Sequence, residues 1–375
     1  MAARGWQSRG TRMIAGAAFV ALAAALPVAA QSPSATPYDV SLFKWSVADE
    51  ADGFDQGLLH DLVVGADGRV LLLGGDRAGD TVSPVVWGSD DGRTWARLEG
   101  DLPPDSIASD GVEADDGFMV ITALGDGGEG RLYRSDGMSL APLEAPTEAL
   151  IAIERSPSGL HLLDGSSPTV WTSTDDGANW TSAIVPGDDA LASHLAVTEA
   201  GTLVVVGTVE DDGRRVPTAW SSTDGGVTWR STTLPIDAGS WVVGDLAWTP
   251  IGLIVRLIDA PGRDGSHVNL LSTDGTTWAP TIETTGSGSV GSAGPEAIIF
   301  GEDAAWHSAD GVTWTEEWWP TLAGFDVVAS QPMPSGPVVA AGVRRDAPAT
   351  GAIFVGAPAP QPVPSAPIDL VSPAP

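Results

Sequence analysis

Polar side chains, three of them aspartates and one a histidine, recur at one fixed distance before a series of glycine turns in this chain. The positions are Asp61, Asp110, His194 and Asp245. Asp326 begins the corresponding segment of the last unit, although it lies further from its glycine than the others do. Carboxylates attract cations and accept hydrogen bonds from hydroxyl groups, so these side chains, grouped together, can hold a sugar, a cation or a basic peptide. The alternative is that the aspartates cap the ends of strands and loops.

A second set of candidate binding residues consists of arginines on variable polar segments between apolar runs. The candidates are Arg77, Arg215, Arg263 and Arg344. The chain has only 18 Lys and Arg residues, so their presence on these segments favours a cationic rim beside the acidic column. Long exposed loops also need charge for solvation alone, and this alternative stays open.

Familiar catalytic and metal-binding patterns are absent from the sequence. The chain has no Cys, its five His are scattered, and it contains no serine-nucleophile elbow or phosphate-binding loop. No segment has the alternating acidic ligands and distal glutamate of a calcium loop. A glycosidase needs only two carboxylates beside a sugar, and 49 acidic residues leave too many candidates. We therefore predict no catalytic residue, no metal and no cofactor.

The elements that position these residues are indicated by a repeated phrase, Ser-x-Asp-(x)-Gly-x-Thr-Trp. Five copies end in Trp, with Asn in place of Thr in one of them, and a sixth, degraded copy ends in Leu140. Successive copies lie about 45 residues apart, a period typical of β-propeller blades. The aspartates are Asp91, Asp136, Asp175, Asp224, Asp274 and Asp310, and the tryptophans are Trp95, Trp180, Trp229, Trp278 and Trp314.

Each phrase is expected to form the hairpin between the third and fourth strands of a blade. Its Asp accepts hydrogen bonds from N–H groups of its own turn, and its Gly adopts the left-handed conformation. Its Trp packs beside the sheet. The phrase is therefore interpreted as a structural device of the fold.

The number of blades follows from the glycine turns. Seven turns between apolar runs occur against six phrases, and the seventh unit stops at a third strand, GAIFVG. Near the start, SLFKWSVADE places Lys44 and Trp45 where other units have Thr-Trp. We predict an all-β, seven-bladed β-propeller of four-stranded blades over residues 38–356, closed by an N-terminal strand that completes the last blade. A six-bladed ring is the alternative.

The phrases resemble the Asp-box, or BNR, repeats of the sialidase-like superfamily, and the resemblance covers most of residues 38–356. Propellers of this kind include sialidases, xyloglucan-degrading enzymes, the luminal domain of sorting receptors and photosystem-assembly proteins. The resemblance thus implies the fold strongly and an activity weakly.

The residues that would perform the sialidase mechanism implied by that resemblance are not evident in this sequence. The family uses three arginines, a Tyr–Glu nucleophile pair, an Asp and an early Arg-Ile-Pro motif. No such motif is present, and only Tyr38 and Tyr133 are available. We expect a non-catalytic glycan- or protein-binding module, with a sialidase-like glycoside hydrolase as the alternative and an envelope scaffold as a third possibility.

The net charge of the chain limits the classes of partner that we expect. The formal net charge is −31 and the isoelectric point is near 4.1. Such a surface repels nucleic acid and anionic lipid. A glycan or an extracellular protein is therefore the expected partner of a monomer.

The terminal segments predict export. Residues 1–30 combine Arg4, Arg9 and Arg12 with an apolar stretch and the small residues Val28-Ala29-Ala30, as a secretory signal peptide does. An uncleaved membrane anchor is the alternative. Residues 31–37 are expected to be a linker, and residues 357–375 a Pro-rich disordered tail. We expect a secreted bacterial protein of the extracellular space or cell envelope, with no membrane insertion after cleavage.

Overall fold

The computed structural model describes residues 42–48, 54, 57–78, 81–124, 130–187, 189–236, 241–259, 266–286, 288–302, 304–347 and 350–359. The predicted signal peptide, the linker, and the tail from residue 360 onward lie outside these ranges, as do Tyr38 and Arg263.

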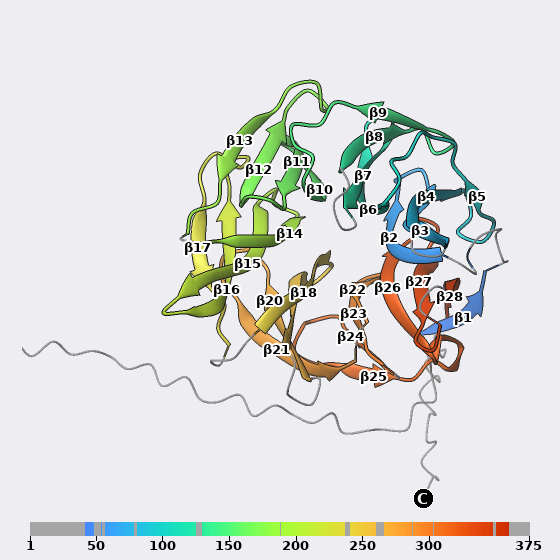
Figure 1. Cartoon of the computed structure of the whole chain (residues 1–375). Coiled ribbons are helices and arrows are strands. Elements are labelled where there is room, and N and C mark those ends of the chain that lie inside the picture. Colours follow the sequence, from blue (N-terminus) through green and yellow to red (C-terminus); the bar gives the residue numbers. More distant parts are fainter. Residues whose placement is uncertain are drawn as a thin grey trace, which may run out of the picture. The chain divides into compact units, whose positions relative to one another are not determined.

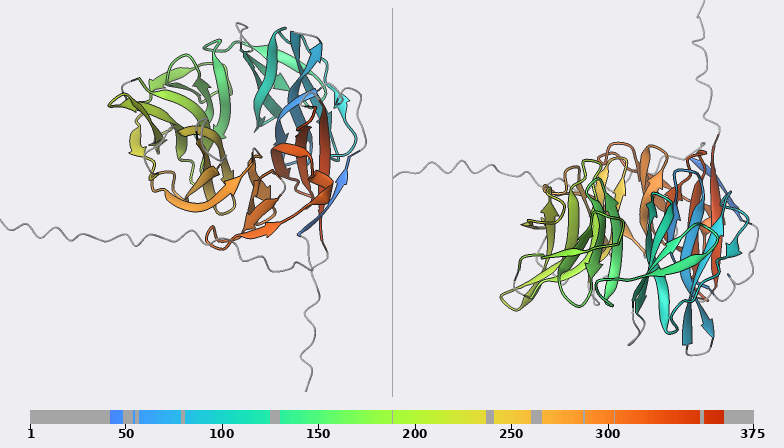
Figure 2. Two further views of the ribbon diagram at one scale, coloured as in Figure 1. Left: turned by 60° about the horizontal axis from the view of Figure 1, so that its bottom comes forward. Right: turned by 90° about the horizontal axis from the view of Figure 1, so that it is seen from above.

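Seven four-stranded antiparallel sheets form a ring, which is a β-propeller (Figure 1). Figure 2 shows the same ring in two other orientations. We number the sheets as blades 1–7 in chain order of their innermost strands. Blade 1 contains β2 (Gly57–Val64), β3 (Val70–Ala78), β4 (Thr81–Ser89) and β5 (Ala96–Arg97); blade 2 contains β6 (Ser106–Ala114), β7 (Gly117–Leu124), β8 (Arg131–Ser135) and β9 (Leu140–Leu143).

The next three blades repeat this order. Blade 3 contains β10 (Leu150–Ser156), β11 (Gly159–Asp164), β12 (Thr169–Ser173) and β13 (Thr181–Ile184). Blade 4 contains β14 (Leu191–Val197), β15 (Leu203–Asp211), β16 (Arg214–Ser222) and β17 (Arg230–Thr233). Blade 5 contains β18 (Trp241–Thr249), β19 (Gly252–Asp259), β20 (Ser266–Ser272) and β21 (Ala279–Thr285).

The last two blades differ in size and connection. Blade 6 has short strands, β22 (Val290–Ala293), β23 (Glu296–Phe300), β24 (Ala305–Ser308) and β25 (Thr315–Glu317). A 3₁₀ turn, η2 (Pro320–Leu322), leads into blade 7, which contains β26 (Phe325–Pro332), β27 (Val338–Arg344), β28 (Gly351–Pro358) and β1 (Phe43–Val47).

The N-terminal strand closes the ring as predicted. Strand β1 pairs antiparallel with β28, with Trp45 opposite Gly356 and Val47 opposite Phe354. Two backbone hydrogen bonds extend the pairing, from Ala48 N to Ile353 O at 2.8 Å and from Ala359 N to Leu42 O at 3.0 Å. The seven-bladed prediction is therefore confirmed over the six-bladed alternative, and β28 continues to Pro358.

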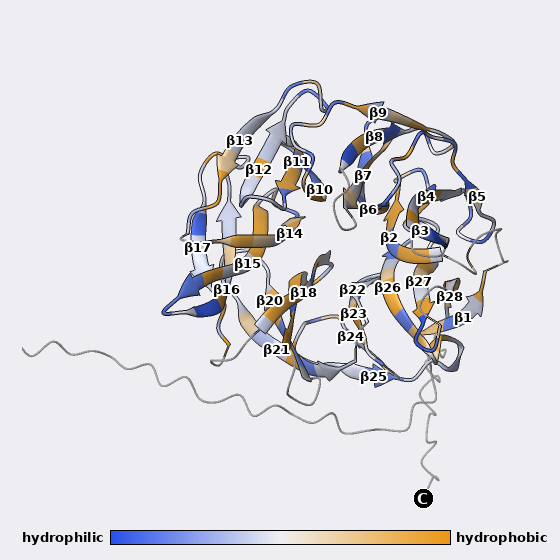
Figure 3. Ribbon diagram, viewed as in Figure 1, coloured by the Kyte–Doolittle hydropathy of each residue, from blue (hydrophilic) through white to orange (hydrophobic). Residues whose placement is uncertain are grey.

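The apolar core lies between adjacent blades. The second strand of each blade is covered on both sides by its neighbours, which is why its sequence is a continuous apolar run such as Val70–Leu73 or Leu203–Val206. These residues are fully buried. Colouring by hydropathy places hydrophobic residues along inner strands such as β2, β14, β18 and β26 (Figure 3). Blade-to-blade packing therefore holds the inner strands around the axis of the ring, and we call the region between these strands the central channel.

The antiparallel order gives the ring two distinct faces. One carries the glycine turns and the phrase hairpins, and we call it the turn face. The other carries the loops between second and third strands and the connections between blades, and we call it the loop face. The turns need a left-handed residue, and Gly68 and Gly336 supply it with φ of 88° and 108°.

The phrase hairpins have the predicted internal hydrogen bonds. In blade 5, Asp274 accepts bonds from the N–H groups of Thr276 and Thr277, both at 2.7 Å. The Ser272 hydroxyl donates to Asp274 at 3.1 Å and accepts from Gly275 N at 2.9 Å. Burial is the largest single effect on the pKa of Asp274 and raises it, but the hydrogen bonds to the carboxylate together outweigh burial and lower the pKa to about 2. This carboxylate is therefore committed to its own turn.

Replacement of Asp274 by Ala should lower the free energy of unfolding by about 1 kcal/mol, because the bonds it removes are charge-assisted but face solvent. Since its folded pKa is depressed, its contribution is present above pH about 4 and is lost as the pH falls through about 2. Urea unfolding at pH 7 measures the difference, with Asp274→Asn as the control that keeps part of the bonding. Equal stability of wild type and Asp274→Ala would contradict this role.

Candidate ligand site in the central channel

The predicted acidic column lies in the middle of the inner strands. Strands β2, β6 and β18 begin at Gly57, Ser106 and Trp241, so the column residues follow several paired residues and do not stand at the strand starts. A β-bulge immediately precedes each column position. In β2 the strand register shifts between Leu59 and Asp61, and the same shift occurs at the equivalent point in β6, β10, β14, β18 and β26. Bulges re-aim the side chains that follow them.

Asp61 and Asp110 form a hydrogen-bonded pair of carboxyl groups on blades 1 and 2. Asp110 also accepts bonds from Ile153 N of blade 3 at 2.8 Å and from Gly111 N at 2.7 Å. Burial, followed by the charge of Asp110, raises the pKa of Asp61 well above its usual range. Burial raises the pKa of Asp110 to about 6, against the lowering effect of its donors. The charged form of Asp61 is therefore disfavoured, and the two carboxyl groups are joined by a hydrogen bond.

Asp245 occupies the same level on blade 5 and is tied to blade 6. Its carboxylate accepts a hydrogen bond from Val290 N at 2.7 Å. Arg256, on β19, lies near enough to interact with this charge. The Arg256 guanidinium is 1% exposed and donates to the carbonyls of Gly288, Gly286 and Phe300 in blade 6. It also donates to His267 Nδ1, at 3.1 Å from Nε.

Two histidines complete this level of the channel. Burial lowers the pKa of both His60 and His194, so both rings are neutral at pH 7. His60, on blade 1, interacts electrostatically with His194 on blade 4. Asp61, also on blade 1, interacts in the same way with Asp245 on blade 5. The His60 side chain is nonetheless exposed, and Asp61 is partly exposed. The groups therefore face one another across a narrow interior that solvent reaches.

Glu154 adds a carboxyl group closer to the turn face. It lies on β10, two residues after the column position of blade 3, which Ala152 occupies. Burial, with a smaller contribution from the charge of Asp110, raises the pKa of Glu154 well above its usual range. In the parts of the chain that the structure describes, no basic side chain forms an ion pair with Asp61, Asp110 or Glu154.

Buried hydroxyl groups without partners lie on the same inner segments. Ser109 precedes Asp110 on β6, Ser289 precedes β22, and Ser330 lies on β26, and all three are less than 10% exposed. Their hydroxyl oxygens have no hydrogen-bond partner among the described residues. Buried polar groups are nearly always hydrogen-bonded, so these hydroxyls are available to water or to a polar ligand.

Other predicted site residues are engaged outside the column. Asp326, near the start of β26, accepts a hydrogen bond from Arg345 at 2.9 Å, and Ala329 occupies the column register of that blade. Arg344 pairs with Asp346 at 2.8 Å, and Arg215 donates to the carbonyl of Asp189 at 2.5 Å. Arg77 is exposed at the end of β3. Arg344 thus bonds within its own loop, whereas Arg215 bonds to the connection that precedes β14.

The chemistry of the channel is that of proton-bearing carboxyl groups and hydroxyls. The described residues contain no group of three His, Cys, Asp or Glu arranged to hold a metal ion. Tyr133 is fully buried on β8, and its hydroxyl donates to the carbonyl of Asp101 at 3.1 Å. This tyrosine is a packing residue with a satisfied hydroxyl, and it is not placed as a nucleophile toward the channel carboxyls.

Sequence reasoning missed Glu154, His60 and Arg256. Glu154 has a detectable signal, because the equivalent positions of other inner strands hold Val63, Val112 or Ala196. A Glu in that apolar register is unusual. His60 could have been found by taking the residue before each column position.

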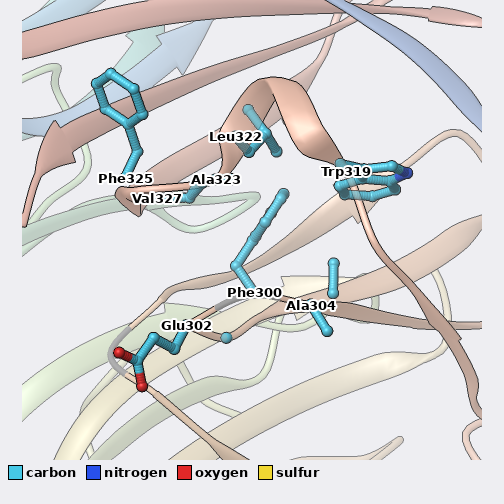
Figure 4. A pocket seen from close by; sticks show the side chains of 10 residues that line it. Phe300, Glu302, Ala304, Trp319, Leu322, Ala323, Phe325 and Val327 are labelled. Carbon is cyan, nitrogen blue, oxygen red and sulfur yellow. The ribbon is translucent and has the colours of Figure 1, made fainter.

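A small cavity lies at the junction of blades 6 and 7, and its lining is mainly apolar, unlike the polar side chains of the channel. It is lined mainly by Phe300, Trp319, Leu322, Phe325 and Val327 (Figure 4). Its volume of about 20 Å³ holds about one water molecule. It is a gap in the apolar core rather than a ligand site.

Comparison with known proteins supports the fold and assigns no family. No protein-family model matches the chain, and no curated protein matches it in sequence. Within the described residues, no helix has the length and apolar character needed to cross a membrane.

Solved structures show the propeller in proteins of diverse function. A chain of the Kuenenia stuttgartiensis hydrazine synthase has a TM-score of 0.54 and 10% identity, covering 80% of this chain and 96% of its own. A chain of a mitotic checkpoint complex has a TM-score of 0.53 and 13% identity, covering 87% and 98%. The NanB sialidase of Streptococcus pneumoniae, at a TM-score of 0.41 and 11% identity, covers 85% and 71%. At these identities the first two matches show the fold alone, and the sialidase match supports no assignment of activity.

Proposed function

We propose that this protein is a non-catalytic binding module, secreted or held at the cell envelope, which binds a glycan or protein ligand through its central channel. The observation that carries the proposal is the uncompensated carboxyl cluster of Asp61, Asp110 and Glu154 on the innermost strands. A channel lined by apolar residues would be more stable, since burial penalises each carboxylate. Ionisable groups with strongly shifted pKa values gather at functional sites more often than elsewhere.

Hydrogen bonding supports a hydroxyl-rich ligand for the loop-face side of the channel. Asp110 and Asp245 are acceptors, and the unpartnered hydroxyls of Ser109 and Ser330 can serve as donors or acceptors. A sugar ring presents donors and acceptors in the same close alternation.

Among the described residues, no nucleophile is placed toward the channel carboxyl groups, which favours binding over hydrolysis. A retaining glycosidase holds its two carboxyl groups about 5 Å apart, with the sugar between them. Asp61 and Asp110 are hydrogen-bonded directly to each other, which leaves no room for a sugar between them. Glycoside hydrolysis is the outcome that would overturn the non-catalytic proposal.

The test is a glycan array together with a panel of fluorogenic glycosides, applied to the protein without residues 1–30. We expect retention on one class of glycan and no release of fluorophore. The double variant Asp61→Asn/Asp245→Asn should weaken that retention by about tenfold or more, since charged hydrogen bonds each contribute about 1.5–3 kcal/mol. The matched control is Asp116→Asn, on an exposed turn of blade 2.

Two results would overturn this proposal. Release of fluorophore that is lost in the double variant would identify a glycoside hydrolase. Unchanged binding by the double variant would remove the channel column from the ligand site.

A further inference from the structure

A wide pocket opens on the turn face, where blades 3, 4 and 5 meet around the channel. Its volume is about 530 Å³, and its lining includes Glu154 and Arg155 from β10, Glu199 from the turn after β14, and Trp248 from β18. Ser156 and Thr198 lie between them. This pocket lies on the turn face, whereas the arginine-bearing loops that the sequence analysis selected lie on the loop face.

Most of the polar groups in the pocket are already paired within the protein. The Arg155 guanidinium bonds to Asp115 at 2.6 Å and to Asp176 at 3.1 Å. The Ser156 hydroxyl bonds to His161 Nε2 at 2.7 Å. The Thr198 hydroxyl accepts from Thr202 N at 3.0 Å. These groups fix the shape of the pocket but have little capacity left for a ligand.

The groups that remain for a ligand are two carboxyls and one indole. Glu154 is bonded only to the backbone N–H of Arg155, and no ion pair neutralises it in the described part of the chain. Glu199 is exposed, and Trp248 is partly buried against the core between blades 4 and 5. Carboxylates beside an aromatic ring attract an organic cation through charge-assisted hydrogen bonds and cation–π contact.

We propose that the pocket of Glu154, Glu199 and Trp248 binds the ammonium or guanidinium group of a basic ligand. A neutral saccharide is the less suitable occupant, because the pocket's hydroxyls and its guanidinium are committed to the protein. The proposal goes beyond the glycan or protein binding in the channel column. It concerns a pocket on the turn face, different residues and a ligand of defined charge.

Binding at this pocket should release a proton. The ionisable groups around Glu154 are Asp110 on β6, His161 opposite it on β11, Arg155 on its own strand and Glu199 at the rim. Burial lowers the pKa of His161 to about 4, so this ring is uncharged at neutral pH, and Arg155 is neutralised by two aspartates. Burial, with a smaller contribution from the charge of Asp110, raises the pKa of Glu154 and disfavours its charged form. A bound cation favours the carboxylate, so affinity should rise with pH.

Isothermal titration calorimetry of the protein without residues 1–30 tests this at physiological salt. The probes are the capped peptides Gly-Lys-Gly and Gly-Arg-Gly, with capped Gly-Gln-Gly as the neutral match and maltotriose as the saccharide arm. Phosphate and Tris buffers differ in ionisation enthalpy, and the difference in measured heat reports the protons released.

We expect the two basic peptides to bind, with release of up to one proton at pH 7. Glu154→Gln should abolish the release and weaken binding by about tenfold, which equals about 1.4 kcal/mol. Glu144→Gln, an exposed change outside the pocket, is the matched control. Asp61→Asn/Asp245→Asn should leave peptide binding largely intact, which separates this proposal from the channel column.

Three results would overturn the proposal. The first is no binding of either basic peptide at millimolar concentration. The second is equal binding by wild type and a Glu154→Gln/Glu199→Gln variant. The third is a preference for maltotriose or the Gln peptide over the basic peptides.

Discussion

Replacement of Arg256 by Met should lower the free energy of unfolding by about 3–5 kcal/mol, because it leaves buried partners of a charge unsatisfied. The guanidinium is buried and donates to three carbonyls of blade 6 and to His267. It also lies close to the carboxylate of Asp245. Methionine fills a similar volume but provides none of these bonds.

The short strands of blade 6 explain why the effect is large. Strands β22 and β23 have four and five residues, and the carbonyls of Gly286 and Gly288 lie before β22 begins. Arg256, from blade 5, gives those carbonyls a donor, and Asp245 accepts from Val290 at the start of β22. Blade 5 therefore anchors its smaller neighbour.

Urea unfolding of Arg256→Met measures this contribution. The matched control is Arg344→Met, which removes an exposed pair with Asp346 and should change stability by less than about 1 kcal/mol. Arg256→Lys should recover only part of the loss, since an ammonium cannot reach all the partners of a planar guanidinium. Equal stability of Arg256→Met and Arg344→Met would contradict the anchoring role.

Replacement of Asp61 by Asn should stabilise the protein at pH 7–8 by an amount on the order of 1–2 kcal/mol, since each unit of pKa shift corresponds to about 1.4 kcal/mol. Burial and the neighbouring Asp110 disfavour the charged form of Asp61. The asparagine amide donates to Asp110 at every pH, so the pair no longer depends on a retained proton. The pKa of Asp110 should stay near 6, because burial raises it and the asparagine amide replaces the donor that Asp61 supplied.

The sign of the pH dependence follows from the raised pKa values. The folded protein binds protons at Asp61 and Asp110 that the unfolded chain has released above pH about 4. Their stabilisation is therefore complete below that pH and is lost as the pH rises through about 6 for Asp110. The advantage of Asp61→Asn should grow over the same window and vanish near pH 4.

Two histidines act in the opposite direction within that window. Burial lowers the pKa of His161 and His267 to about 4. Their unfolded forms bind protons below pH about 6.5, so stability falls as the pH drops from about 6.5 to about 4. Subtracting the wild-type unfolding curve from the Asp61→Asn curve isolates the carboxyl pair. A difference that does not change with pH would contradict a shared proton, and Asp116→Asn provides the flat control.

The fold was predictable because its signals are local in the chain. The phrase hairpins, the glycine turns and the apolar second strands each lie within a few consecutive residues. Closure of the ring was predictable because Lys44 and Trp45 occupy the place of a missing fourth strand, and they pair with Ala357 and Gly356. The resemblance of the phrases to Asp-box repeats stays a prediction about ancestry.

The channel was only partly predictable because its geometry depends on contacts between blades. Counting from the turn glycines selected Asp61, Asp110, His194 and Asp245, and the recurring bulge explains why they share one level. Arg256 stands within an apolar run, and its partner carbonyls lie 30, 32 and 44 residues further along the chain. No local pattern reveals such a bond.

The central claim is that burial in the channel raises the pKa of the carboxyl groups of Asp61 and Asp110, and carboxyl-carbon NMR titration of wild type and Asp61→Asn tests it directly. We predict two carboxyl groups titrating above the ordinary range in wild type, one of them near pH 6 and assigned to Asp110, and the loss of the other in Asp61→Asn. If every Asp and Glu carboxyl of the wild type titrates below pH about 4.5, in the ordinary range of these side chains, the claim is contradicted.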